Sequence, residues 1–134
     1  MDFFKEAFDG FRPHLDEDAA IKFSLNVLLM EGRLKRLVDL ISQSSNVGCI
    51  EGDPGWEIEH IINSDRGLPG YASWPEWASY RAAVDTDCYQ LAYPEVYLSE
   101  NDFFSYVEKA IKAYLEKHPH HLDDLNDLIK LIEK

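Results

Sequence analysis

The sequence predicts an α+β fold in which helices at both ends of the chain enclose a small central antiparallel sheet. Apolar side chains recur at helical spacing before residue 42 and again after residue 99, whereas the middle is rich in aromatic, β-branched and turn residues. The chain has 134 residues, of which 46% are hydrophobic, enough for one domain with its own core. We therefore expect a single domain, 1–134, with N-terminal helices, a small central antiparallel sheet and two C-terminal helices.

Three helical segments are expected before the sheet. Phe4, Phe8 and Phe11 recur at helical spacing, and Gly10 and Pro13 would end this first helix. The acidic run 16–18 suits the positive end of a second helix, which we expect to end at Gly32. Its predicted apolar stripe and that of a third helix contain these residues: Ala20, Phe23, Val27 and Met30, then Leu34, Leu37, Val38 and Ile41.

The middle of the chain predicts short strands. Residues 56–62 alternate apolar and polar side chains at first, which indicates a strand. A short helix starting at Pro54 and capped by Asp53 is the alternative, because Pro is favoured at the first helical position. Three further strands are predicted over 77–84, 88–91 and 95–98, with Asp85-Thr86-Asp87 as a hairpin turn.

The C-terminal helices have the clearest boundaries. Ser99 precedes an acidic first turn and resembles the start of a capping box. An apolar face continues from Phe103 to His118, and Pro119 ends that helix. A final short amphipathic helix is predicted over 122–132.

The charge of the chain excludes several classes of function. Twenty-five acidic residues against 13 basic ones give a formal net charge of −12. Nucleic-acid binders and polybasic membrane-surface modules both need a basic footprint, so neither class fits. No apolar stretch is long enough to span a membrane, and the N-terminus lacks the order of a secretory leader. We therefore expect a cytoplasmic protein.

No motif indicates catalysis, a cofactor or a metal. The sequence contains no glycine-rich phosphate loop, nucleophile elbow or zinc-type Cys/His spacing. Cys49 and Cys88 have no basic neighbour that would lower the thiol pKa, so we expect buried small residues on strands. An enzyme is a third option for the function, but it would require a pocket with perturbed titrating groups.

The acidic residues are segregated along the chain. No basic residue lies between Arg36 and Arg66 or between Arg81 and Lys109, and these two stretches carry all the excess negative charge. If the predicted strands are neighbours, one face of the molecule is concentrated in carboxylates. We expect the charged part of that face to be formed by these acids: Asp53, Glu57, Glu59, Asp85, Asp87 and Glu95.

An aromatic, turn-rich segment follows the first predicted strand. Residues 68–77 contain Tyr71, Trp74 and Trp77, and Trp56 is the first residue of the strand predicted before this segment. Trp and Tyr are enriched at interface hot spots because they offer large, stiff, amphipathic contact area. We expect these four side chains to be the aromatic anchors of an interface, although a Trp under a loop can also belong to the core.

The region from the last predicted strand onward resembles a known family. Glu95-Val96-Tyr97-Leu98-Ser99 leads into a capped helix with Phe103, Tyr106 and Ala110 in the pattern F-x-x-Y-x-x-x-A, and Tyr114 and His118-Pro119 close it as Y-x-x-x-H-P. This run is similar to the C-terminal half of immunity proteins of contact-dependent growth inhibition systems paired with ribonuclease toxins. The helices around Met30-Glu31-Gly32 fit the general layout of that family. Residues 51–93 do not match it.

The resemblance implies a non-catalytic inhibitor that binds a cognate basic toxin domain, a nuclease, inside the cytoplasm. An acidic surface fits such a partner, because nuclease clefts must attract a polyanion. The alternative is a small-ligand or carbohydrate-binding module that uses the 71–77 aromatic loop. Association with a basic protein weakens with salt, whereas stacking on a sugar does not.

Overall fold

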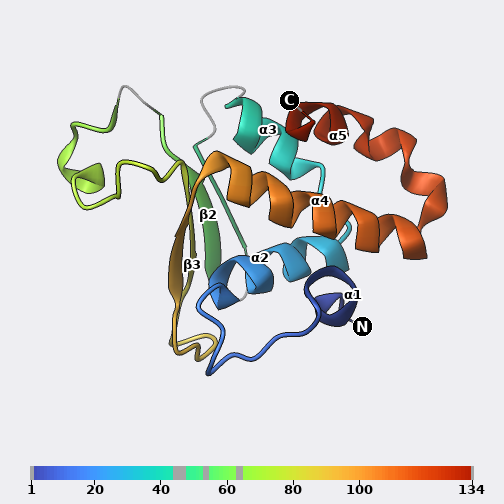
Figure 1. The fold of residues 1–134 in the computed structure, drawn as a ribbon, viewed down its shortest axis with the longest axis horizontal. Helices are drawn as coiled ribbons and strands as arrows, with labels where there is room; N and C mark the ends of the chain where they lie inside the picture. Colours follow the sequence, from blue (N-terminus) through green and yellow to red (C-terminus); the bar gives the residue numbers. More distant parts are fainter. Residues whose placement is uncertain (1, 44–47, 53–54, 63–64, 134) are drawn as a thin grey trace.

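The structure is a computed structural model that describes residues 2–43, 48–52, 55–62 and 65–133. Within these residues it confirms the predicted α+β fold, with five α-helices and a four-stranded antiparallel sheet in the order β1-β2-β3-β4 (Figure 1). The helices are α1 (Phe4–Phe8), α2 (Ala19–Met30), α3 (Arg36–Ser42), α4 (Glu100–Lys117) and α5 (Asn126–Ile132). The strands are β1 (Cys49–Gly52), β2 (Trp56–His60), β3 (Tyr80–Val84) and β4 (Glu95–Leu98).

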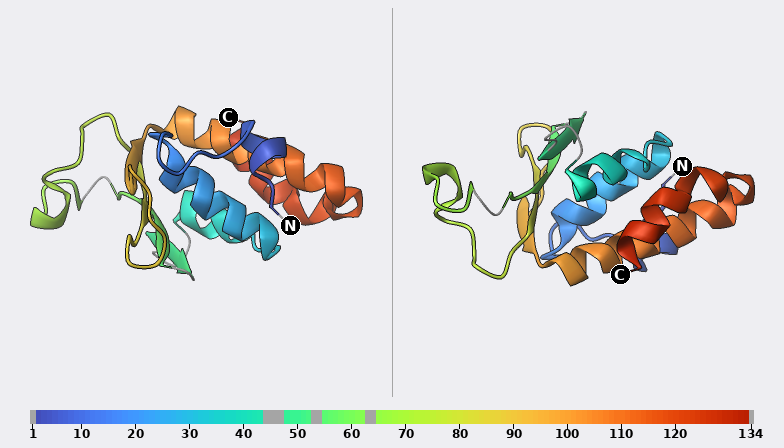
Figure 2. Two further views of the ribbon diagram at one scale, coloured as in Figure 1. Left: turned by 90° about the horizontal axis from the view of Figure 1, so that it is seen from below. Right: turned by 90° about the horizontal axis from the view of Figure 1, so that it is seen from above.

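The described helices form a layer on one face of the sheet. Figures 1 and 2 show the helices on one side and the loop 65–79 projecting on the other. Side chains that alternate inward on all four strands, among them Ile50, Ile58, Ala82 and Leu98, are buried against the helices. None of the helices among the described residues therefore covers the opposite face of the sheet.

Helix α2 is the centre of the helical layer. It packs against β3, β2, β4, α4 and α1, so it is buried on most sides rather than along one stripe. Of the predicted stripe, Ala20 and Phe23 are buried, but Met30 is 52% exposed at the C-terminal end. A helix between two layers needs apolar residues all round, which hides the usual amphipathic pattern.

The boundaries of α4 follow the predicted signals. The Ser99 hydroxyl accepts a hydrogen bond from the Asp102 amide at 3.1 Å, which confirms the N-cap. The helix ends at Lys117, before Pro119. The last predicted helix is also present, as the short 3₁₀ turn 123–125 followed by α5, which packs against α3 and α4.

The segment around Trp56 is a strand and not the alternative helix. Strand β2 pairs with β1 on one side and β3 on the other, with Trp56 opposite Gly52 and Val84. The indole lies over Gly52, where an added Cβ would meet it at 2.8 Å. The glycine is therefore needed for this close approach.

The connection between β3 and β4 corrects the prediction. Residues 88–91 do not form a strand, β3 begins at Tyr80 rather than at residue 77, and β3 pairs directly with β4. The Asp85 carboxylate accepts a hydrogen bond from the Asp87 amide, so the predicted turn is present. It forms the start of the longer connection 85–94 and not a tight hairpin. That connection docks on the N-terminal region, because the Ala92 amide donates to the Pro13 carbonyl and Tyr89 packs on Phe23.

Both cysteines are exposed, which corrects the prediction of buried positions. Cys49 lies on edge strand β1, and Cys88 lies in the connection 85–94. Each has a surface position because the strand predicted around Cys88 does not form and Cys49 faces away from the helices.

Three aromatic rings form a stack that includes the buried Tyr80 and Phe103 and the half-buried His60. Tyr80 lies between Phe103, at 3.8 Å between ring centroids, and His60, at 4.2 Å. His60 Nδ1 lies 2.9 Å from the Leu40 carbonyl oxygen, to which it can donate, and burial lowers the His60 pKa. The imidazole is therefore held neutral near pH 7.

None of the helices that the structure describes is long and apolar enough to cross a membrane.

Candidate functional site

The candidate site is the face of the sheet turned away from the helices, which we call the outer face. The strand register places eight side chains there in two rows, Cys49-Glu59-Arg81-Tyr97 and Glu51-Glu57-Ala83-Glu95. The rows form because side chains alternate between the two faces along each strand, and because residues paired across neighbouring strands point to the same face. Three of the predicted acids, Glu57, Glu59 and Glu95, are thus brought together on one surface.

Arg81 lies at the centre of these carboxylates. Its Nη1 donates to Glu57 and to Glu59, each at 2.9 Å, and its Nε donates to Glu95 at 2.5 Å. Partial burial opposes the charged form, but the hydrogen bonds to Glu57 and Glu95 raise the pKa of Arg81 above its usual range. The guanidinium therefore remains charged and links β2, β3 and β4 across the outer face.

One guanidinium does not neutralise the outer face. Four glutamates lie in the two rows with Arg81 as the one basic residue, so the rows carry a formal charge of −3. Although the Cys49 side chain is exposed to solvent, partial desolvation of its sulfur and then the negative charges of Glu57, Glu59 and Glu51 raise the pKa of the thiol to about 12. The thiol is protonated at neutral pH and is a poor nucleophile.

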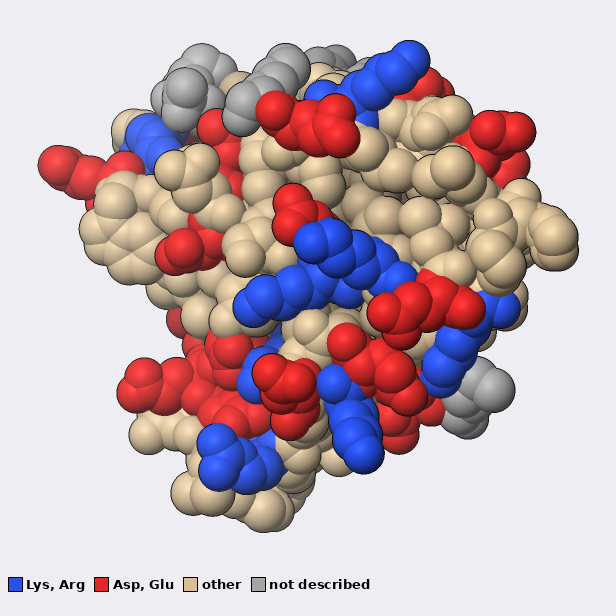
Figure 3. Space-filling model, turned by 45° about the vertical axis from the view of Figure 1, so that its right-hand side comes forward, with Lys and Arg blue, Asp and Glu red and all other residues tan. Residues whose placement is uncertain are grey.

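The remaining predicted acids lie apart from the rows. Asp85 and Asp87 are exposed in the connection after β3, and Asp53 lies outside the described residues. Part of the second acidic stretch, Glu100, Asp102 and Glu108, belongs to α4 instead of the sheet. The helical side seen in Figure 3 carries Lys and Arg interspersed with Asp and Glu.

The four predicted aromatic anchors have different environments. Trp56 is 2% exposed on the inner face of the sheet and therefore belongs to the core. Trp74 is buried in a second small cluster with Ile61 and Ala78, on which Tyr71 and Tyr97 pack. Trp77 is 61% exposed.

The aromatic cluster adjoins the outer face through two contacts. The Trp74 ring meets Tyr97, the last member of the first row, edge to face at 5.3 Å between centroids. The Tyr71 hydroxyl donates to Glu59 at 3.5 Å. The loop 65–79 therefore continues the outer face and presents Leu68 and Trp77 to solvent.

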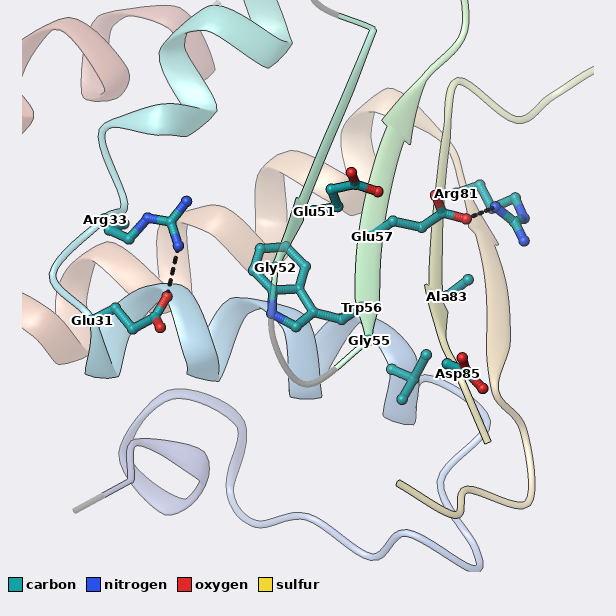
Figure 4. Close-up of a pocket in the computed structure, with 11 residues that line it drawn as sticks. Glu31, Arg33, Glu51, Gly52, Gly55, Trp56, Glu57, Arg81, Ala83 and Asp85 are labelled. Atoms are coloured by element: carbon teal, nitrogen blue, oxygen red, sulfur yellow. Dashed lines mark hydrogen bonds and ion pairs between the residues drawn. The ribbon is translucent and has the colours of Figure 1, made fainter. Parts of the chain in front are cut away.

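A polar hollow of about 800 Å³, lined in part by Gly52 and Gly55, opens at one end of the sheet. Figure 4 shows Glu31 and Arg33, from the turn after α2, on one side of β1 and the Glu57–Arg81 pair on the other. Arg33 Nη1 donates to Glu31 at 2.9 Å. Glu51, Ala83 and Asp85 also line this hollow.

The sequence prediction missed Glu51 and Arg81 as members of the site. Glu51 lies on β1, a strand of four residues that is too short to give a clear alternating pattern. Arg81 stands in sequence at the edge of an acidic stretch, not within it. Only the strand register places both residues on the outer face. In the fold, Arg81 lies between residues from both acidic stretches.

No family model, curated protein or solved structure matches this chain. Among the residues that the structure describes, no three His, Cys, Asp or Glu side chains are grouped to hold a metal ion.

Proposed function

We propose that this protein is an immunity protein that binds a cognate nuclease toxin domain, of the ribonuclease kind, and neutralises it without catalysis. The observation that supports the proposal is the outer face, where four glutamates lie with a single arginine, which pairs with three of them, beside an aromatic loop. A nuclease that attracts a polyanion has a basic cleft, and an anionic surface of this kind can pair with it. The proposed compartment is the cytoplasm.

The contact surface that we propose contains the acids Glu57, Glu59, Asp85, Asp87 and Glu95 with Tyr71 and Trp77. Trp74 contributes indirectly by holding the loop against Tyr97. Trp56 is left out because its side chain is covered on the inner face. Buried charge pairs at such an interface are sensitive to truncation, at roughly 2–5 kcal/mol each.

The carbohydrate-binding alternative has less support. Trp74 and Tyr71 pack edge to face on each other, at 5.4 Å between centroids, and are not open platforms for a sugar ring. Within the 68–77 segment this leaves Trp77 as the broadly exposed aromatic side chain.

Co-expression with the product of the open reading frame immediately upstream tests the proposal. A tagged copy of this protein should recover a basic domain in a stoichiometric complex whose nuclease activity is suppressed. Glu57→Lys with Glu95→Lys should release the domain and restore its activity, while Asp123→Lys with Asp127→Lys, the same charge change on the C-terminal helices, should not. Recovery of this protein alone, beside a soluble upstream product, would contradict the proposal.

A further inference from the structure

The outer face contains one pair of like charges that Arg81 does not bridge. Glu51 on β1 lies directly opposite Glu57 on β2. The His60 amide donates to the Gly48 carbonyl, which makes that pair hydrogen-bonded and, by alternation, makes Glu51 and Glu57 a non-hydrogen-bonded pair. Side chains are closest at such positions, with Cα atoms about 4.5 Å apart.

Two carboxylates at this spacing oppose folding. Like charges directly opposite each other on neighbouring strands are destabilising. Figure 4 shows the ion pair between Arg81 and Glu57. Glu51 is exposed, and no ion pair joins it to any described cation. In the free protein the repulsion within this pair is thus offset from one side only.

We propose that the Glu51–Glu57 pair is the seat for one arginine side chain of the partner protein, inserted from the polar hollow. This inference rests on the proposed function and adds Glu51 to its contact surface. The charge of the site selects a cation, and the hollow of about 800 Å³ that both glutamates line gives a side chain access. A guanidinium fits better than an ammonium because its planar fork can reach two carboxylates at once.

A bound arginine would complete a repeating arrangement across the sheet. Arg81 links the carboxylates of β2, β3 and β4 from within the chain. A partner arginine between Glu51 and Glu57 does the same for β1 and β2. A second copy of this chain cannot supply the charge from its own outer face, which is equally anionic.

The proposal predicts opposite effects of one substitution on folding and on binding. Glu51→Gln removes the repulsion and should raise the free energy of unfolding, but it should weaken the capture of an arginine side chain about fivefold, the scale of an exposed ion pair. If Glu51 had a purely structural role, its substitution would not raise the free energy of unfolding and weaken arginine binding at the same time. Asp127→Asn removes the same charge from α5 and is the matched control for binding.

The experiment is a nuclear magnetic resonance titration of the full-length ¹⁵N-labelled protein with the peptide Gly-Arg-Gly-Arg-Gly at constant ionic strength. We expect the largest amide shifts at Cys49, Glu51, Glu57 and Ala83, with weaker binding in Glu51→Gln and unchanged binding in Asp127→Asn. The Gly-Lys-Gly-Lys-Gly peptide and calcium chloride are comparison probes, and both should shift these amides less.

Three results would overturn the inference: equal loss of affinity in both variants, shifts spread evenly over α5, or an equal response to calcium. None of them depends on the toxin. The upstream product could still co-purify after such a result, which would locate its contacts elsewhere, and a positive titration could stand even if no toxin were recovered.

Discussion

At the scale of single residues, Tyr80 is unusual because its hydroxyl is buried without a hydrogen-bond partner among the described residues. The side chain is 0% exposed between His60 and Phe103, and burial raises its pKa, so the hydroxyl remains protonated. Tyr80→Phe removes the unsatisfied group and keeps the ring stack. We expect the free energy of unfolding in urea to stay the same or rise by about 1 kcal/mol.

Tyr106→Phe is the matched comparison for Tyr80→Phe. The Tyr106 hydroxyl donates to the Asp18 carboxylate, which joins α4 to the segment before α2. Its loss should lower the free energy of unfolding by about 1–2 kcal/mol, since Asp18 is partly exposed and also pairs with Lys22. Equal destabilisation by the two substitutions would mean that Tyr80 has a partner in solution.

At the scale of elements, the loop 65–79 is attached by a cluster of its own. Ile61, Trp74 and Ala78 are separate from the main core, so the loop can open without unfolding the helices. In Trp74→Ala we expect the amides of the substituted residue and of Ala78 to exchange hydrogen at least about tenfold faster than in the unsubstituted protein, because a buried Trp contributes more than about 1.4 kcal/mol. Exchange in α2 should change much less.

Trp77→Ala controls for the loss of an indole from the same loop. Trp77 is exposed, so its removal should leave exchange in the loop and in α2 unchanged. If Trp74→Ala accelerates exchange in α2 as much as in the loop, the two clusters unfold as one unit.

The elements also show how far sequence reasoning reaches. The helix α4 was predictable because Ser99 and Pro119 act within one or two turns of chain. The connection 85–94 was not, because Tyr89 and Leu91 have the composition of a strand but are held by Phe23 and the core. Residues of high β-propensity suit a half-buried surface. A loop that packs on the core also provides such a surface, so composition alone does not distinguish it from a strand.

The site was predictable in its composition but not in its geometry. The excess of acids in the sheet region could be read from the sequence, and Glu57 and Glu59 could be placed on one face by alternation. The pairing of Arg81 with three glutamates depends on the order and register of β2, β3 and β4. The burial of Trp56 likewise depends on which face of the sheet the helices cover.

At the scale of the whole molecule, a net charge of −12 should make stability depend on salt. Self-repulsion of a highly charged chain disfavours the compact state, and salt shortens its range from about 30 Å at 0.01 M to about 10 Å at 0.1 M. We expect thermal unfolding to show that the free energy of unfolding rises by an amount on the order of 1 kcal/mol between these two salt concentrations. The ion pairs of Arg81 oppose this rise, because salt also screens their attraction.

Arg81→Gln should therefore make the salt dependence steeper than in the natural sequence. It removes the attraction that salt weakens and leaves Glu57, Glu59 and Glu95 to repel one another on the outer face. Lys112→Gln changes the net charge equally, but its partner Glu108 is an exposed neighbour on α4, so its salt dependence should stay close to that of the unsubstituted protein. Equal slopes for the two variants would mean that total charge alone sets the response, whereas a steeper slope for Arg81→Gln places the repulsion on the sheet face that we propose for partner binding.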